Sequence, residues 1–505
     1  MRGPGPPEAP VGAGFLVPAV LAFLSLALVV LLRHEMWQDE WQAWLLATGS
    51  PTLPDLFRNL RYEGHPCLWY LALFGVGRLT HSPLGIQLLH LVVATSSVYL
   101  ICQYSPFSRL QKILFIFGYF PFYEYAAISR NYALGVLGLF SFCAVFGMPR
   151  PRNYLLLAAI LLLLCQTSVY GVMLALPLGV VLFGAALRDP AAGTWKTAAA
   201  GTIVLLGVGL AVVQLVPPAD SGFAVDWNFH LDFRHLTETL ATVWRGYVPI
   251  PARDYHFWGT NFVPDPRWQA VLAVILLAFG LLLFLPQALP FFLYAVGTLG
   301  LLAFAYTKYP GSIRHHGHLF LLFMASLWLS SYFPERKIRP AWLGVFSGFC
   351  RTHRHRVVVA LMAAQLLAGW WAASMDLAFP FSASKEAAGF IQQHRLEEML
   401  ILGDADDAAS SVAGYLGRRL YYPASRRWGS FVIWDQQRAR VTPGELTRQA
   451  RELSRGRQQD ALLLLNYELP PGSLPMILLK RFGGSLVPAE NYCLYLLPSR
   501  AGDPQ

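Results

Sequence analysis

Charged residues are scarce in this chain of 505 amino acids, at 13% of the total, whereas 55% are hydrophobic. A soluble globular protein usually has about a quarter of its residues charged, so the composition predicts a protein that crosses the membrane several times. The formal net charge is +10, but Lys and Arg are spread over short loops between apolar runs, as topology signals are. We therefore expect a lipid bilayer as partner and no nucleic acid.

Cysteine motifs and glycine-rich loops are also missing. The six cysteines are scattered without a CxxC pair or a metal-ligand spacing, so we interpret them as small core residues, with a contact between Cys67 and Cys493 as the alternative. No GxGxxG or GxxxxGK[ST] sequence follows a predicted strand, which argues against a nucleotide site. No small-x-small cleavage site follows the first apolar run, so we expect that run to stay as a membrane helix.

Long apolar runs are plentiful. A helix needs about 20 apolar residues to cross a hydrocarbon core of about 30 Å, and eleven runs come close to this length. They cover 14–32, 84–101, 110–125, 131–148, 154–168, 171–187, 198–216, 268–286, 288–306, 317–333 and 356–376. A twelfth candidate, 66–79, is short and begins with Pro66. Depending on this segment, the sequence predicts a bundle of about 11–12 spans.

The basic loops set the expected orientation. Positively charged short loops normally stay in the cytoplasm, and the ones here fit a single topology if 66–79 does not fully cross. That topology has the N-terminus inside and the segments 33–83, 126–130, 217–267, 307–316 and everything after 376 on the outer face. The alternative is that 66–79 crosses and another weak segment does not.

The composition changes after residue 376, where short β-rich runs alternate with helix-like stretches. The expected strands are 399–404, 419–423, 431–435, 462–466 and 491–497, and the expected helices are 384–394, 406–418 and 443–455. This alternation predicts a small α/β domain with a largely parallel sheet. We thus divide the chain into a membrane domain, 1–376, and an outer α/β domain, 377–505.

The first outer segment contains the densest group of ionisable residues. Asp39 and Glu40 follow the first apolar run directly, and a partly buried carboxylate at a wet membrane boundary can act as a general base or bind a metal ion. An N-terminal helix cap at Asp39 explains the pattern equally well. Further along, Glu63 and His65 flank Gly64. This pair could hold a metal ion, but a hydrogen-bonded turn is the commoner explanation.

Cations are concentrated at two other outer boundaries. Arg130 and Tyr132 lie in the sequence YEYAAISRNYAL, where an arginine suits phosphate; an ion pair with Glu124 is the alternative. The sequence TKYPGSIRHHGH then contributes Lys308, Arg314 and His316, together with two more histidines. We interpret this second group as a phosphate-binding site.

Rings and charges alternate in the long outer segment 217–267, which contains Trp227, Trp244 and Trp258. Such a segment suits a sugar or a lipid headgroup, because aromatic rings stack on apolar sugar faces. An aromatic belt at the membrane interface is an equally good interpretation.

The order of these motifs resembles a known superfamily. The chain has W-x-DE-x-x-x-W after its first apolar run, then EGHPCLWYL, SRNYAL and YP-x-x-x-RHH, and finally a tail that begins SASKEAAGFI. It is similar in this to the GT-C membrane glycosyltransferases, and within them to the bacterial mannosyltransferase-like and aminoarabinose-transferase-like branch, of the family 39 type. The resemblance covers roughly the whole chain, although Pro66-Cys67-Leu68 stands where the family has Pro-Pro-Leu.

The resemblance implies a fold, a reaction and roles for the residues above. It implies a mostly α membrane bundle and transfer of a sugar from a polyprenyl-phosphate donor to an unidentified acceptor on the outer face of the bacterial inner membrane. Asp39, with Glu40 beside it, matches the catalytic carboxylate. Arg130, Tyr132 and Arg314 match donor-binding positions, to which the residues themselves add Lys308. Glu63, His65 and His316 would shape the acceptor site or hold a divalent cation, the one candidate cofactor.

Two other classes of function remain open at this stage. The chain could be a transporter or flippase for a lipid-linked anion, although no half of it resembles the other, as inverted repeats would. It could also be a non-catalytic protein of envelope assembly, in which Asp39 would only cap a helix.

Overall fold

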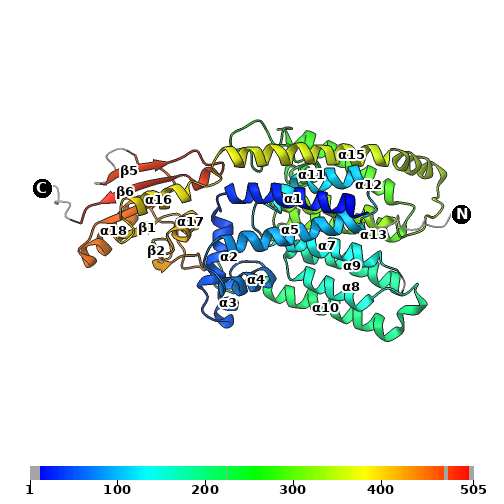
Figure 1. Ribbon diagram of the computed structural model, residues 1–505, viewed down its shortest axis with the longest axis horizontal. Coiled ribbons are helices and arrows are strands. Elements are labelled where there is room, and N and C mark those ends of the chain that lie inside the picture. Colours follow the sequence, from blue (N-terminus) through cyan, green and yellow to red (C-terminus); the bar gives the residue numbers. More distant parts are fainter. Residues whose placement is uncertain (1–11, 150, 223–224, 471–475, 500–505) are drawn as a thin grey trace.

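The computed structural model describes residues 12–149, 151–222, 225–470 and 476–499. The molecule is elongated, with a bundle of helices at one end and a smaller domain that contains a sheet at the other (Figure 1). The helices of the bundle coincide with the predicted apolar runs. They are α1 (Ala13–Arg33), α5 (Leu84–Tyr104), α6 (Arg109–Ile116), η1 (Tyr119–Glu124), α7 (Tyr132–Phe146), α8 (Tyr154–Cys165), α9 (Val169–Ala186), α10 (Thr194–Leu215), α12 (Pro266–Phe284), α13 (Ala288–Thr307), α14 (Ile313–Ser330) and α15 (Ala341–Ala378).

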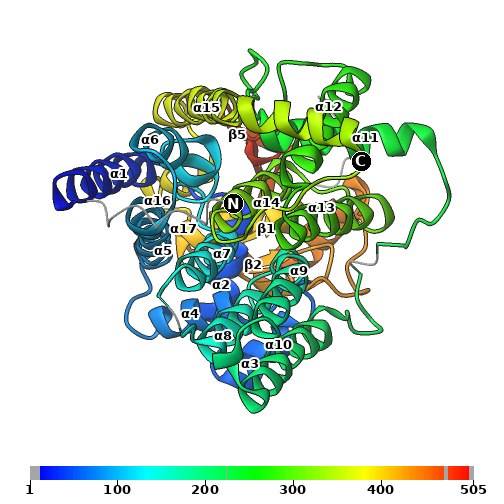
Figure 2. The same ribbon diagram turned by 90° about the vertical axis from the view of Figure 1, so that its right-hand side faces the viewer.

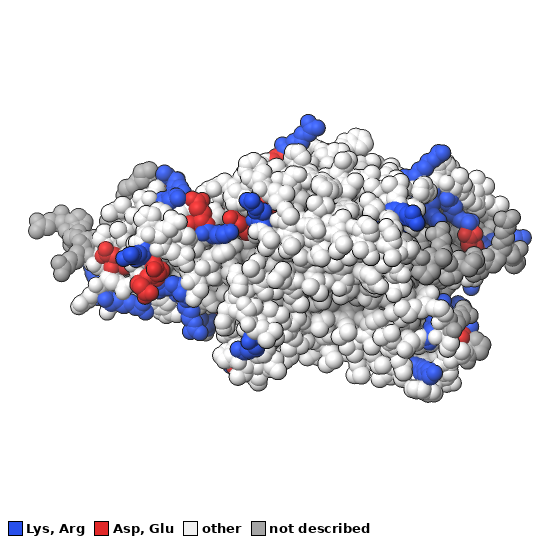
Figure 3. All heavy atoms as spheres, in the orientation of Figure 1, with Lys and Arg blue, Asp and Glu red and all other residues white. Residues whose placement is uncertain are grey.

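The bundle is that of a multi-pass membrane protein. Within the described residues, seven helices are long and apolar enough to cross a bilayer, namely α1, α5, α9, α10, α12, α13 and α15. The run 110–125 is divided between α6 and η1, a π-helix, and the remaining runs form α7, α8 and α14. On the face drawn in Figure 3, most charged side chains gather at the two ends, and an almost uncharged band separates them. The prediction of a mostly α membrane bundle is thus confirmed.

Helix α14 is surrounded by the other helices (Figure 2). Every residue from His315 to Ser330 is buried, as expected for a helix that is apolar on all sides. Only the side of its first turn that carries Arg314 is partly exposed. Helix α14 therefore presents the guanidinium group of Arg314 at the end that faces the small domain.

Three short helices lie between the bundle and the small domain: α2 (Gln38–Gly49), α3 (Leu53–Leu60) and α4 (Leu68–Gly77). Helix α4 contains 10 residues, which corresponds to about 15 Å at 1.5 Å per residue and is too short to cross a bilayer. It packs against α2 and α5. The segment 66–79 therefore does not form a span of its own.

The long segment between α10 and α12 is more regular than an open loop. Its middle forms α11 (Phe233–Tyr247), which packs against α12 and α14. Trp244 is tied to Asn261 by a hydrogen bond of 3.1 Å from its indole nitrogen, whereas Trp227 is 58% exposed. The aromatic residues of this segment therefore have different environments and do not form one surface.

The small domain has a six-stranded sheet in the order β3-β2-β1-β4-β6-β5. Strand β1 (Leu400–Gly403) runs parallel to β2 (Leu420–Tyr422) and β4 (Ala461–Leu465). The pairs of β2 with β3 (Arg427–Gly429), of β4 with β6 (Tyr492–Leu497) and of β6 with β5 (Ile477–Phe482) are antiparallel. The α/β class is confirmed, and the expectation of a largely parallel sheet is wrong.

Helices α16 (Ser384–Gln393), α17 (Asp406–Leu416) and α18 (Pro443–Arg457) form where they were expected, and a short η3 (Pro488–Glu490) precedes β6. The predicted strand 431–435 forms no ladder and makes only an isolated bridge between Asp435 and Ser221. Its first residue, Phe431, packs against the apolar cluster of α2, so a contact between domains explains part of the apolar pattern that suggested a strand. All six cysteines are free thiols, and Cys67 and Cys493 form no disulfide.

The small domain packs directly on α2. Helix α17 lies so close that a Cβ atom on Gly414 would be 2.2 Å from the ring of Trp41, so only glycine fits there. At the start of α2, the buried side chain of Glu490 accepts a hydrogen bond of 2.8 Å from the backbone N–H of Gln38. The hydroxyls of Ser382 and Tyr492 donate to its other oxygen at 2.5 and 3.0 Å. This carboxyl group therefore joins the two domains.

Glu490 should make the stability of the protein depend on pH. Burial raises its pKa from 4.5 to about 7, so between these values the folded state keeps a proton that the unfolded state releases. Its contribution is complete below about pH 4.5 and is lost as the pH rises through 7, with a maximum on the order of 3 kcal/mol. Glu490→Gln has no charge to bury and should lose less stability than the wild type between pH 5 and pH 8, as measured by thermal unfolding in detergent.

The matched control is Glu386→Gln on α16, where the carboxylate is half exposed and forms an ion pair with Lys480. This control should keep the pH dependence of the wild type. An unchanged dependence in Glu490→Gln itself would contradict the prediction.

Candidate functional site

Asp39 lies in the first turn of α2, and the cap of this helix is Trp37. The side chains of Trp37, Trp41 and Trp44 are buried and fix the helix between the bundle and the small domain. Asp39 therefore lies near the start of a helix, as the alternative interpretation expected, although it is not the capping residue itself. Its carboxylate turns toward the bundle and keeps 26% of its side-chain surface exposed.

Two guanidinium groups converge on one oxygen of Asp39. The Nη2 atom of Arg314 donates to Oδ2 at 3.0 Å, and the Nη1 atom of Arg130 lies 3.3 Å from the same oxygen. Arg130 also donates to the backbone carbonyl of Asp39 at 2.6 Å. These three predicted site residues thus lie together, although they come from three separate segments. Arg130 pairs with Asp39 and not with Glu124, which was the alternative.

This arrangement controls the charge of Asp39. Burial acts to raise the pKa of its carboxyl group, but Arg130 and Arg314 outweigh burial and hold the pKa below its usual value. The side chains of Arg130 and Arg314 are only 11% and 14% exposed. Within the described residues their Nε atoms are buried and make no hydrogen bond. The small part of each guanidinium group that remains exposed could meet a further anion beside Asp39.

Aromatic rings form the wall beside Arg314. Its guanidinium carbon lies 5.3 Å from the ring centre of Trp37 and 5.6 Å from that of Trp258. The Trp258 indole donates to Glu124 at 3.1 Å, which holds this ring in place. Trp258 is the one tryptophan of the predicted aromatic segment that reaches the arginine pair.

Glu40 faces away from Asp39. It is fully buried, and its Oε1 atom accepts a hydrogen bond of 2.6 Å from the backbone N–H of Ser129. Its Oε2 atom lies 2.9 Å from Nε2 of His34. Glu40 therefore links the start of α2 to His34 and to the backbone of Ser129. It does not lie beside Asp39 as the second catalytic carboxylate that the sequence predicted.

Glu63 lies beside Gln42 of α2, and the His65 ring centre lies 6.3 Å from that of Tyr132 at the start of α7. Glu63 accepts hydrogen bonds from Gln42 at 2.7 Å and from the Tyr70 hydroxyl at 3.1 Å, and burial raises its pKa to about 7. Burial and the charge of Arg130 lower the pKa of His65 to about 3, so its imidazole is neutral at pH 7. Near neutral pH, Glu63 is thus able to gain or lose a proton, and His65 is not.

Tyr132 lies next to the arginine pair, but His316 and Lys308 do not join it. The Tyr132 hydroxyl is 2.7 Å from Nε2 of His315, the histidine that the sequence analysis did not single out. His316 instead approaches the Pro310 carbonyl at 3.1 Å. The ammonium group of Lys308 donates to the Val225 carbonyl and lies 4.8 Å from the Trp227 ring centre.

A divalent cation does not fit this set of residues. Within the described parts of the chain, no group of three or more His, Cys, Asp or Glu side chains is positioned to hold a metal ion. Moreover, two guanidinium groups already provide the positive charge at Asp39, and like charges repel a cation. We therefore assign no step to a metal ion.

Four residues of this region were missed from the sequence. His34 and Asp376 are ionisable groups at the ends of apolar runs, a pattern that usually marks function and could have identified them. The amide group of Gln42 exchanges two hydrogen bonds with the backbone of Val432, at 2.7 and 2.9 Å. Neither Gln42 nor Glu490 carries a pattern in the sequence that predicts its contact.

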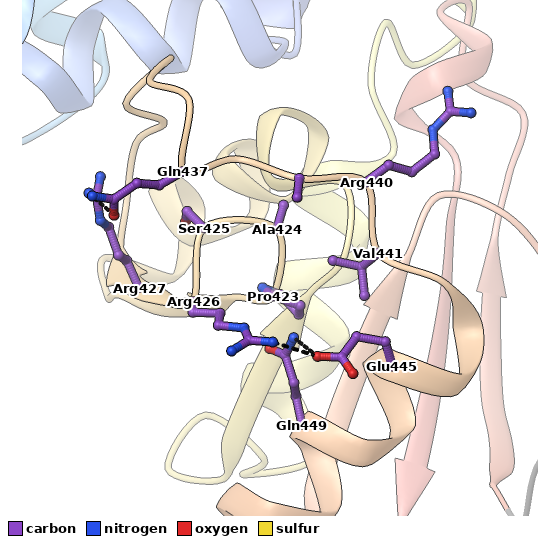
Figure 4. A pocket seen from close by; sticks show the side chains of 11 residues that line it. Pro423, Ala424, Ser425, Arg426, Arg427, Gln437, Arg440, Val441, Glu445 and Gln449 are labelled. Carbon is purple, nitrogen blue, oxygen red and sulfur yellow. Dashed lines mark hydrogen bonds and ion pairs between the residues drawn. The ribbon is translucent and has the colours of Figure 1, made fainter. Parts of the chain in front are cut away.

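A separate cleft of about 610 Å³ lies in the small domain, between the β2–β3 turn, the segment 437–441 and the start of α18 (Figure 4). Arg426 pairs with Glu445, and Arg427 pairs with Asp435. The side chain of Arg440 extends away from the cleft in this view. The charged groups here thus mainly bind one another, and we assign no chemistry to this cleft.

Comparison with known proteins identifies the fold. No protein-family model matches the chain, and no curated protein matches its sequence. Among solved structures, ArnT from Cupriavidus metallidurans bound to undecaprenyl phosphate is similar over 98% of this chain and 100% of its own, with a TM-score of 0.51 and 12% identity. ArnT from the same organism in the apo state matches over 97% of this chain and 99% of its own, with a TM-score of 0.48 and 15% identity.

The protein therefore has the fold of the GT-C membrane glycosyltransferases, as the resemblance in the sequence predicted. Within that fold, it is similar to the aminoarabinose transferase ArnT along nearly its whole length.

Proposed function

We propose that this protein is a membrane glycosyltransferase that moves a sugar from a polyprenyl-phosphate donor to an acceptor hydroxyl or amine. The observation that carries the proposal is the convergence of Arg130 and Arg314 on Asp39. A base and two phosphate-binding groups are what this reaction needs in one place. The solved neighbour was crystallised with undecaprenyl phosphate, which supports this class of donor.

In the proposed reaction, the Asp39 carboxylate takes the proton of the acceptor O–H or N–H group. The acceptor atom then attacks the anomeric carbon of the sugar. The bond between that carbon and the phosphate oxygen breaks, and the polyprenyl phosphate leaves with the bonding electrons. Arg130 and Arg314 stabilise the negative charge that develops on this leaving group.

The same two arginines would couple donor binding to the strength of the base. Their charges hold the pKa of Asp39 below its usual value, which makes Asp39 a weak base on its own. A phosphate group that binds to both guanidinium groups would offset part of this positive charge. The pKa of Asp39 would then rise, so the base would become effective only after the donor has bound.

We further propose that Asp39 and the domain 377–505 lie on the outer face of a bacterial inner membrane. The short basic loops of the sequence support this orientation. Helix α15 connects the two sides, since it begins near the basic segment 336–339 and ends at the small domain (Figure 1). The acceptor would approach α2 from the side of Glu63 and His65.

Alkaline phosphatase fusions test the orientation, because this enzyme is active only outside the cytoplasm. A fusion after Ser382 should be active, and a fusion after Arg339 should be inactive. The reverse pattern in whole-cell phosphatase assays would contradict the proposed topology.

Replacing Arg314 tests the phosphate site. Arg314→Ala should weaken binding of undecaprenyl phosphate by about 1.5–3 kcal/mol, the range for hydrogen bonds that involve a charged group, measured on protein in nanodiscs. Lys308→Ala is the matched comparison, because Lys308 contacts Val225 and Trp227 instead of Asp39, and its effect should be smaller. Unchanged binding in both Arg314→Ala and Arg130→Ala would remove the arginines from the donor site.

Asp39→Asn tests the base itself. Asparagine keeps the size of the side chain but does not accept the proton, so turnover should fall about 10²–10⁴-fold, while undecaprenyl phosphate binding persists. Asp55→Asn is the control, because this exposed carboxylate also pairs with an arginine, Arg58, at 2.9 Å. Full activity of Asp39→Asn together with loss in Glu63→Gln would transfer the role of base to Glu63. Full activity of both variants would contradict a catalytic role for this region and would favour a transporter or an assembly protein.

A further inference from the structure

A buried chain of three ionisable groups lies directly behind the proposed active site. His34 follows the last turn of α1, with its Nδ1 atom 2.7 Å from Oδ2 of Asp376 and its Nε2 atom 2.9 Å from Oε2 of Glu40. All three side chains are 0% exposed. They join the end of α1, the start of α2 and the end of α15, three elements that meet near the small domain (Figure 1).

The geometry defines the charge of His34. Ionised carboxylates only accept hydrogen bonds, so a histidine between two of them must donate from both ring nitrogens, as only the imidazolium form does. Burial alone would lower the pKa of His34, but the charges of Asp376 and Glu40 outweigh burial and raise it well above its usual value. Among the described residues, the other ionisable groups that face this region are Glu35, His90, Tyr123, Glu124 and, on α17, Tyr415. His34 is therefore an imidazolium cation between two buried carboxyl groups.

The position of Glu40 links this cluster to the active site. Glu40 adjoins Asp39 in the chain, and its other oxygen accepts from the backbone N–H of Ser129 at 2.6 Å. Ser129 in turn adjoins Arg130. One carboxylate thus connects the backbone beside the proposed base to the backbone beside a proposed phosphate-binding arginine, and His34 holds that carboxylate in place.

We propose that His34 is a positioning residue of the transfer reaction. As an imidazolium between Asp376 and Glu40, it donates a hydrogen bond to Glu40, keeps Glu40 bound to the Ser129 amide, and so holds Asp39 and Arg130 opposite each other. The proposal rests on the proposed function for the roles of Asp39 and Arg130. The cluster does not touch the reacting atoms, since its members are fully buried.

The variant His34→Gln should separate this role from simple packing. Glutamine fills similar space, but it is neutral and can donate toward only one carboxylate at a time. Turnover should fall about 10–100-fold, the scale of a displacement near 1 Å, whereas the KM for the donor should change less than about threefold. The double variant His34→Gln/Glu40→Gln removes the carboxylate of Glu40 together with the imidazolium and keeps an oxygen for the Ser129 amide. Its turnover should recover at least half of the decrease seen in His34→Gln, measured on a logarithmic scale.

A second readout does not depend on transfer activity. Hydrogen exchange of the segment 126–131 should accelerate at least tenfold in His34→Gln, because the Ser129 N–H loses its fixed acceptor, and should slow again in the double variant. His90→Gln is the matched control, since His90 is equally buried and its Nδ1 atom faces the Ala126 carbonyl at 3.2 Å. This control should leave the Ser129 amide protected. Nitrogen-15 NMR of labelled histidine should also find both His34 nitrogens protonated at pH 8.

Each outcome supports or overturns the proposal. A neutral His34 at pH 8, or unchanged exchange of 126–131 in His34→Gln, would overturn it. So would a His34→Gln enzyme with full turnover, or a double variant that recovers nothing while it unfolds at the temperature of the wild type. If the wild type transfers no sugar but the exchange and NMR results are as expected, the proposed function fails and the bracing of Asp39 against Arg130 stands.

Discussion

The ion pair of Asp39 with Arg130 and Arg314 is the interaction on which the rest of the structure depends. Removing one partner from such a partly desolvated group leaves an unpaired charge, which costs several kcal/mol when the charge is buried. The three side chains come from the start of α2, the turn before α7 and the first turn of α14. The bundle, the short outer helices and the small domain all restrict where these segments can lie.

Neighbouring residues at the start of α2 have different contacts. Asp39 turns toward the arginines, Glu40 turns into the protein toward His34 and Ser129, and Gln42 turns toward Glu63 and Val432. Because successive helical residues point about 100° apart, a single helical turn serves three environments. This explains why two adjacent carboxylates of the same motif have different roles, with one partly exposed and the other completely buried.

Apolar periodicity and local motifs predicted the membrane bundle, the α/β class of the small domain and the segments of the arginine site. The sequence did not distinguish Glu40 from Asp39, or His315 from His316, because both pairs are adjacent and only the packing of the helix decides which side chain faces the site. The mixed sheet was missed because β3 and β5 are short or partly exposed. The apolar run 431–435 was mistaken for a strand, although Phe431 packs against the apolar cluster of α2 instead. Lys308 was assigned to the phosphate site from its charge alone, and its position beside Trp227 depends on a long-range contact that no local pattern records.

The side chain of Gln42 forms two hydrogen bonds with Val432 of the small domain, and both involve only backbone groups, the carbonyl and the N–H of Val432. Any side chain that leaves this backbone geometry intact can occupy position 432 without breaking the two hydrogen bonds. The side chains of the β2–α18 region can therefore change, by mutation or by exchange, while these two hydrogen bonds to the helix that carries Asp39 persist. The small domain is thus attached to α2 at two positions, Gln38 and Gln42, which contact Glu490 and the backbone of Val432.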